Sequence, residues 1–113
     1  MKIVYIAGPY RGATANETYK NIQTAREYAV KFWGLGFAVF CPHLNSAFMD
    51  GVTDDKIFLK AGLRFLRAAD FIFMVPGWVK SQGAMAEYKE AMKLGVPEIG
   101  LFDNCAIVPG DIT

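Results

Sequence analysis

The sequence alternates between short apolar runs, rich in β-branched and aromatic residues, and longer runs with helical periodicity. The short runs span residues 3–7, 37–41, 71–75, 99–102 and 106–108. Strands that are apolar at nearly every position are buried on both faces, as in a parallel sheet covered by helices. Right-handed crossovers leave few topologies, of which a flavodoxin-like strand order is the simplest. We therefore predict an α/β fold: a three-layer, flavodoxin-like (Rossmann-like), doubly wound sheet of four to five mainly parallel strands.

Capping residues indicate where the helices begin and end. Thr14 and Glu17 fit a capping box, and the helix that follows is expected to end at Gly34 or Gly36. Two further helices are expected over residues 56–69 and 81–94. The chain has 113 residues with no repeat, linker or low-complexity stretch, so residues 1–113 are expected to form one domain.

Composition argues against several classes of function. Twelve basic and 11 acidic residues give a net charge of +1 and no polybasic half, which disfavours binding to a nucleic-acid duplex. Two cysteines and one histidine are too few for an ordinary zinc site, and we expect neither a metal nor a cofactor. The apolar runs fall far short of the roughly 20 residues that cross a bilayer, and no signal peptide is expected. These features predict a cytoplasmic protein with no membrane partner.

The fold class itself predicts where a ligand would bind. In open parallel sheets, ligands bind outside the carboxyl ends of the strands. The segments expected at that edge are residues 8–13, 42–50 and 76–83. Asp70 precedes its strand and enters from the opposite edge, so we predict a structural role for it.

Glu87 breaks the pattern of the last helix. At helical spacing it falls between Ala91 and Leu94, inside the apolar arc. Burying an unpartnered carboxylate costs several kcal/mol. The side chain therefore either reaches solvent from the edge of the helix or faces a cavity that uses it.

The start of the same helix carries a second signal. Ser81 is the expected N-cap, and Gly83 would let a ligand approach the backbone closely. Helix N-termini of this kind bind anions, and Glu87 would lie about two turns further along. The alternative is an ordinary N-cap serine followed by a glycine.

The segment from Gly8 to Gly12 follows the first strand but matches neither a dinucleotide-binding nor a Walker motif. Arg11 either pairs with a phosphate or carboxylate or is a solvated arginine in a tight turn. Tyr10 or Trp78 would be able to stack on a planar base. His43 and Asn45 follow the second strand, and a lone histidine in that place is either a hydrogen-bonded loop residue or a catalytic one.

Taken together, three segments resemble the nucleoside 2-deoxyribosyltransferase superfamily, which includes deoxynucleoside 5′-monophosphate N-glycosidases and uncharacterised bacterial and phage proteins. They are Tyr-Ile-Ala-Gly-Pro-Tyr-Arg-Gly at residues 5–12, Pro-Gly-Trp at 76–78 and Ser-x-Gly-x-x-x-Glu at 81–87. The resemblance extends from Tyr5 to Pro97 and implies the same small doubly wound α/β fold.

The resemblance implies that Glu87 attacks the anomeric carbon of a nucleoside sugar and forms a glycosyl-enzyme intermediate, which water or a second base resolves. Tyr5 matches a tyrosine that holds this carboxylate. Arg11, Ser81 and Gly83 match contacts to a 5′-phosphate, and Gly8, Tyr10, His43, Asn45 and Trp78 are the further residues expected to bind substrate. Relatives often complete their sites with a neighbouring subunit, which implies a homo-oligomer, a dimer or larger.

One departure from the family pattern concerns the general acid. Many relatives carry an aspartate where this chain has Gly62, eight residues before Asp70. Asp50, Asp54, Asp55 or His43 would have to replace it, and without any acid the rate would fall by roughly 10²–10⁴-fold. Two alternatives to an enzyme therefore stay open: a non-catalytic binding module for a nucleotide or nucleotide-derived ligand, and a flavin carrier with the same strand order.

Overall fold

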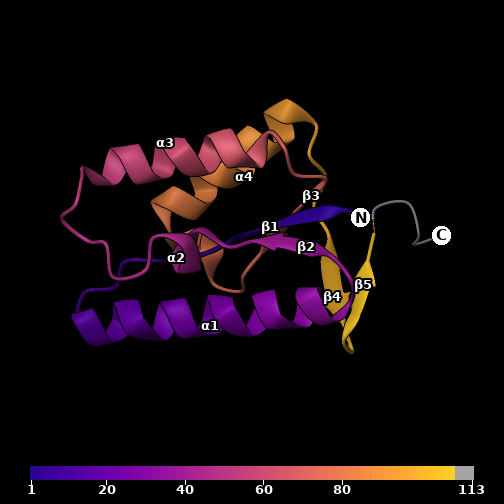
Figure 1. Cartoon of the computed structure of the whole chain (residues 1–113), viewed down its shortest axis with the longest axis horizontal. Coiled ribbons are helices and arrows are strands. Elements are labelled where there is room, and N and C mark those ends of the chain that lie inside the picture. The colour runs from indigo at the N-terminus through magenta and orange to yellow at the C-terminus, as the bar shows by residue number, and fades with distance from the viewer. Residues whose placement is uncertain (109–113) are drawn as a thin grey trace.

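The computed structural model describes residues 1–108. The order of elements is β1 (Ile3–Ala7), α1 (Ala15–Gly34), β2 (Ala38–Phe40), α2 (Pro42–Asn45), α3 (Asp55–Leu66), β3 (Phe71–Met74), the 3₁₀ helix η1 (Trp78–Lys80), α4 (Gln82–Leu94), β4 (Gly100–Phe102) and β5 (Cys105–Ile107). Figure 1 shows α3 and α4 together on one side of the strands and α1 on the other. None of the helices in residues 1–108 combines the length and apolar character needed to span a membrane.

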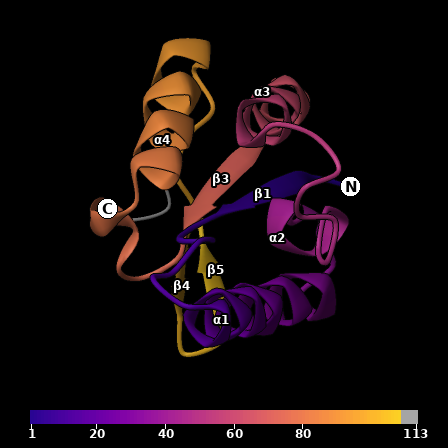
Figure 2. The ribbon, with the colours of Figure 1, turned by 90° about the vertical axis from the view of Figure 1, so that its left-hand side faces the viewer.

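The parallel sheet has β1 at its centre, in the order β2-β1-β3. Tyr5 of β1 is paired with Phe40 on one side and with Ile72 on the other. The connection from β1 to β2 runs through α1 and that from β2 to β3 through α3, on opposite faces of the sheet (Figure 2). This arrangement confirms the predicted three-layer, doubly wound α/β fold.

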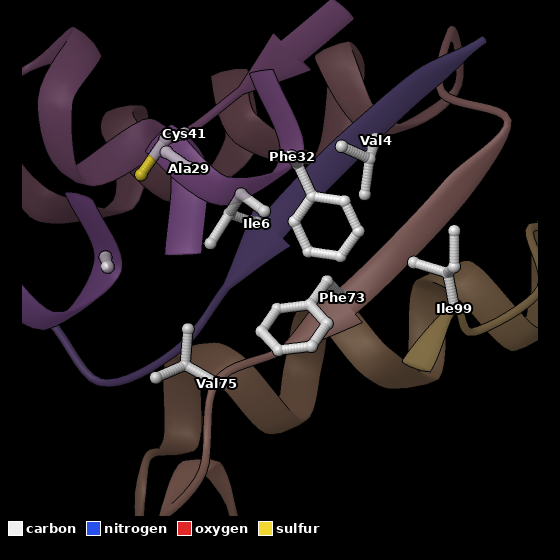
Figure 3. Close-up of a cluster of buried hydrophobic side chains, with 9 residues drawn as sticks. Val4, Ile6, Ala29, Phe32, Cys41, Phe73, Val75 and Ile99 are labelled. Carbon is white, nitrogen blue, oxygen red and sulfur yellow. The ribbon is translucent and has the colours of Figure 1, made fainter. Parts of the chain in front are cut away.

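Alternate residues of β1 divide the core into two clusters. Val4 and Ile6 pack on the α1 side, where the rings of Phe32 and Phe73 lie with their centroids 5.1 Å apart (Figure 3). Tyr5 and Ala7 belong to the other cluster, beneath α3 and α4. The two-residue period of a strand therefore directs the Tyr5 side chain toward the α3–α4 layer.

The prediction of four to five strands in one sheet needs correction. β4 and β5 form a separate antiparallel pair, and within residues 1–108 a single parallel bridge, between Ile72 and Glu98, extends the main sheet beyond β3. The pair is a hairpin whose loop residues, Asp103 and Asn104, both have positive φ. A loop of this kind joins adjacent antiparallel strands, so the chain folds back on itself instead of continuing the parallel sheet.

The predicted helix starts are confirmed by their caps. The hydroxyl groups of Thr14 and Ser81 accept hydrogen bonds from the backbone N–H groups of Glu17 and Ala84. The helix predicted over residues 56–69 spans Asp55–Leu66, and the short helices α2 and η1 were not predicted. Asp70 accepts a hydrogen bond from the backbone N–H of Ile3 at 2.8 Å, in line with its predicted structural role.

Candidate functional site

A cavity of about 1000 Å³ opens at the carboxyl ends of the three parallel strands. Its walls come from the β1–α1 loop, α2, the first two turns of α3, and the segment from η1 into α4. The three loops that the sequence places at this edge thus meet around one space. A volume of this size accommodates a nucleotide-sized ligand.

Glu87 and Tyr5 meet at the inner wall of this cavity. Glu87 lies on α4 and is only 7% exposed, while Tyr5 on β1 is fully buried. The Tyr5 hydroxyl donates a hydrogen bond to the Glu87 carboxylate. Glu87 therefore does not reach bulk solvent from a helix edge; it faces the cavity with one protein donor on its carboxylate.

Burial changes the acidity of both groups. Loss of solvent raises the pKa of Glu87 to about 7, although the hydrogen bond from Tyr5 acts in the opposite direction. Burial and the neighbouring carboxylate raise the pKa of the Tyr5 hydroxyl, which therefore stays protonated. Near neutral pH Glu87 exchanges between its charged and neutral forms, as expected of a group with a chemical role in a pocket.

Gly62 of α3 faces this pair from the other side. A Cβ atom at this position would lie 2.7 Å from the Tyr5 hydroxyl oxygen and 4.0 Å from Oε2 of Glu87. A side chain here would therefore occupy the space of the hydroxyl group. The position at which the resemblance implies an aspartate is next to the Tyr5–Glu87 pair, but it contributes only a hydrogen atom.

The N-terminus of α4 forms another part of the wall. Ser81, Gln82 and Gly83 line the cavity together with Lys80 of η1. The Ser81 hydroxyl caps the helix by accepting from the N–H of Ala84 at 3.1 Å. The partial positive charge of a helix N-terminus and the ammonium group of Lys80 thus lie on the same side of the cavity.

Arg11 lies at the mouth of the cavity among carboxylates. Its Nε and Nη2 atoms donate to the two Asp55 carboxylate oxygens at 2.9 and 2.7 Å, and its Nη1 lies 3.5 Å from Asp50. The Tyr10 hydroxyl donates to Asp50 at 2.9 Å. The Arg11 guanidinium holds the pKa of Asp55 below its usual range. Asp55 is thus an ionised partner of Arg11, and the arginine is paired with carboxylates while its side chain stays exposed to solvent.

His43 lines the cavity, and its ring is hydrogen-bonded to the backbone. It is buried, and its Nε2 lies 2.8 Å from the carbonyl oxygen of Pro9, to which it donates. Burial lowers the pKa of His43, so the ring is neutral near pH 7. Its ordered position fixes the loop after β1 against α2.

The structure brings together eight of the ten predicted site residues. The residues that line the cavity are Tyr5, Gly8, Tyr10, Arg11, His43, Ser81, Gly83 and Glu87. Trp78 instead packs on Tyr88, with ring centroids 4.9 Å apart, and Asn45 at the end of α2 is exposed; neither lines the cavity. Trp78 is turned away because η1, which the sequence did not reveal, places it against α4.

Several lining residues were missed by sequence reasoning. Asn21 donates to the carbonyl oxygen of Tyr10 at 3.0 Å, and Phe58 and Leu59 form the apolar wall on α3. The register of α3 is the signal that could have placed the latter two beside Gly62, one turn away. Within residues 1–108, acidic, cysteine and histidine side chains do not gather in groups of three or more that could hold a metal ion.

Comparison with solved structures shows that this fold occurs in a nucleoside-processing enzyme. The chain is similar to a 2-deoxyribosyltransferase from the psychrotolerant bacterium Bacillus psychrosaccharolyticus, with a TM-score of 0.62 and 22% sequence identity over 85% of this chain and 69% of that one. A search of curated proteins found no match. Residues 2–99 match a family model described as a domain of unknown function, DUF4406. Since the match covers most of the sequence, the chain belongs to the DUF4406 family.

Proposed function

We propose that this protein cleaves or transfers the N-glycosidic bond of a (deoxy)nucleoside or nucleoside 5′-monophosphate through a glycosyl-enzyme intermediate on Glu87. The observation that carries the proposal is the buried Glu87 carboxylate, held by the Tyr5 hydroxyl and facing a nucleotide-sized cavity at the carboxyl edge of the sheet. Its likeness in fold to a 2-deoxyribosyltransferase supports the same class of reaction.

In the proposed reaction, ionised Glu87 attacks the anomeric carbon of the sugar as the bond to the base breaks. Tyr5 positions the carboxylate by donating to one oxygen, which leaves the other oxygen for the sugar. Water or a second base then attacks the same carbon and releases Glu87. Two displacements give overall retention of configuration.

The remaining lining residues divide into two groups for binding. Ser81, Gly83 and Lys80 would face a 5′-phosphate at the N-terminus of α4. Gly8, Tyr10 and His43 would contact the sugar and base from the opposite loops. Arg11 would reach a phosphate only by sharing or leaving its pairing with Asp55.

The experiment is base release from a panel of nucleosides and their 5′-monophosphates, followed by chromatography. Glu87→Gln keeps the size and hydrogen-bond acceptor but removes the nucleophile, so it should abolish release. Glu90→Gln is the matched control, since Glu90 lies on the same helix and does not line the cavity. Release by Glu87→Gln at the rate of the parent would refute the assigned role.

A second candidate, a binding module for a nucleotide-derived ligand, is favoured by one observation. The α3 wall offers Gly62 beside the Tyr5–Glu87 pair, where a catalytic acid would be useful. A ligand that raises the melting temperature and is recovered unchanged would support this function over catalysis.

A further inference from the structure

We infer that the site acts on N-glycosides whose base carries a positive charge, such as N7-alkylated purine or pyridinium nucleosides. This inference rests on the proposed function and specifies its substrate class. Two features of the cavity support it: its lining lacks a side chain suited to protonate a leaving base, and acidic side chains outnumber basic ones.

A neutral base is a poor leaving group unless an acid protonates it as the bond breaks. The titratable side chains that line the cavity within residues 1–108 are Tyr5, Tyr10, Arg11, Glu17, His43, Asp50, Asp55, Lys80 and Glu87. Among residues 1–108 of a single chain, an acid for the base must come from this set; otherwise solvent supplies the proton.

The carboxylates at the mouth are occupied as acceptors. Asp55 receives two hydrogen bonds from Arg11, and Asp50 receives one from Tyr10. Glu17 accepts from the backbone N–H of Ala13 at 2.7 Å, at the start of α1. In these pairs the carboxylate oxygens accept, so these contacts leave no carboxyl proton directed at a leaving base.

His43 and Tyr5 also donate their protons within the protein. His43 uses its Nε2 proton on the carbonyl oxygen of Pro9, and Tyr5 uses its hydroxyl proton on Glu87. Guanidinium and ammonium groups such as Arg11 and Lys80 are weak acids. Glu87 itself must be ionised to attack. Apart from the weakly acidic ammonium group of Lys80, the described cavity therefore holds no side chain that is free to protonate a leaving base.

The α3 wall next to the Tyr5–Glu87 pair strengthens this conclusion. Phe58 and Leu59 are apolar, and Gly62 has no room for a side chain while the Tyr5 hydroxyl occupies its position. Thus the nearest wall from which an acid could reach the base is built of groups that cannot donate a proton.

A cationic base needs no proton. When Glu87 attacks the anomeric carbon, the electron pair of the C–N bond returns to the ring nitrogen, and the positive charge on the base is neutralised. The base leaves as a neutral molecule. Water then displaces Glu87, the sugar gains a hydroxyl group, and one proton passes to solvent, so charge and atoms balance over the cycle.

The charge of the cavity also suits a cation. Glu17, Asp50, Asp55 and ionised Glu87 outnumber Arg11 and Lys80 among the lining residues. An excess of negative charge attracts a cationic ligand. A positive base beside Glu87 also favours the ionised form of that carboxylate, so substrate binding itself would activate the nucleophile.

The test compares N7-methylguanosine with guanosine, which differ by one methyl group and one positive charge. The 5′-monophosphates of both, and nicotinamide riboside, extend the comparison. Base release with Glu87→Gln is subtracted from release by the parent protein, which removes the spontaneous loss of base from each substrate. Circular dichroism checks that the variant is folded. We expect corrected rates at least about 100-fold higher for the cationic member of each pair.

The pH profile gives a second readout. With nicotinamide riboside, whose pyridinium charge does not titrate, the corrected rate should rise as Glu87 ionises and then stay level, because no general acid is lost at higher pH. Corrected rates for guanosine within tenfold of those for its methylated counterpart would overturn the substrate class but leave the glycosidase function standing. If no substrate of either kind is cleaved above the Glu87→Gln background, both the inference and the proposed function are wrong.

Discussion

The Tyr5 hydroxyl group packs directly against Gly62: a Cβ atom on Gly62 would lie only 2.7 Å from the hydroxyl oxygen. The glycine lies inside α3, where it lowers helix stability by about 1 kcal/mol relative to alanine. The hydroxyl that it accommodates is the only one that hydrogen-bonds the Glu87 carboxylate in the described structure. A local loss of helix stability thus permits the hydrogen bond at the centre of the site.

The first prediction concerns Gly62→Ala. The new methyl group must push the Tyr5 ring aside, and overpacking of this kind costs roughly 1–3 kcal/mol, which exceeds the gain in helix propensity. We expect net destabilisation in urea unfolding. In a Tyr5→Phe background the hydroxyl is gone, so the same substitution should cost much less.

Gly34→Ala is the control for this experiment. Gly34 is exposed at the end of α1, and a Cβ atom there would meet nothing within 4 Å. This variant should be slightly more stable than the parent, by about 0.5–1 kcal/mol. Equal effects of Gly62→Ala with and without the Tyr5 hydroxyl would show that the predicted clash does not occur.

The second prediction concerns the pH dependence of base release in Tyr5→Phe. The hydrogen bond from Tyr5 lowers the pKa of Glu87, which burial raises to about 7. Its removal should move the acidic limb of the kcat/KM profile to higher pH. Tyr28→Phe, a change in the opposite core cluster, should leave the limb where it is. A lower rate with an unmoved limb would assign Tyr5 a packing role only.

The third prediction concerns stability. The folded-state pKa of Glu87 lies above its unfolded value, so the native state holds more protons between about pH 4.5 and 7. Glu87 therefore favours folding at low pH, and this contribution, on the order of 3 kcal/mol, is lost as pH rises through 7. Glu87→Gln should remove that dependence and be the more stable protein at pH 8. The free energy of unfolding is measured from denaturant curves at several pH values, with Glu90→Gln as control. The same pH dependence of this free energy in the parent and in Glu87→Gln would contradict the prediction.

The fourth prediction separates two roles of Arg11. The Arg11–Asp55 pair is exposed and screened by solvent, so breaking it should change stability little. Asp55→Asn weakens the hold on the guanidinium and should increase affinity for a 5′-monophosphate but not for the nucleoside. Arg11→Ala should reduce the difference in affinity between the 5′-monophosphate and the nucleoside. Calorimetric titration of both ligands measures it, and an unchanged preference in both variants would exclude Arg11 from phosphate binding.

The sequence was sufficient to predict the elements whose signals are local. The apolar strands, the caps at Thr14 and Ser81, and the position of Glu87 within an apolar helical arc all depend on residues close in sequence. The rule that ligands bind at the carboxyl edge of parallel strands then placed most of the lining residues correctly.

What the sequence could not predict depends on contacts between distant segments. The pairing of Arg11 with Asp55 joins the β1–α1 loop to α3, and neither residue signals the other. The orientation of Trp78 depends on η1, and the separation of β4 and β5 from the main sheet depends on two loop residues with positive φ. Gly62 was recognised as unusual, but only the packing of α3 over β1 shows which atom fills its place.

Tyr5 and Glu87 are separated by 82 positions in the chain, with Tyr5 in the first strand and Glu87 in α4. Closing so long a loop carries an entropic cost that the layers folded in between must offset. A nascent chain on the ribosome therefore has the tyrosine long before the carboxylate exists. Any chemistry of this pair begins only once synthesis has passed α4, so translation products that stop short of α4 carry the tyrosine without its carboxylate partner.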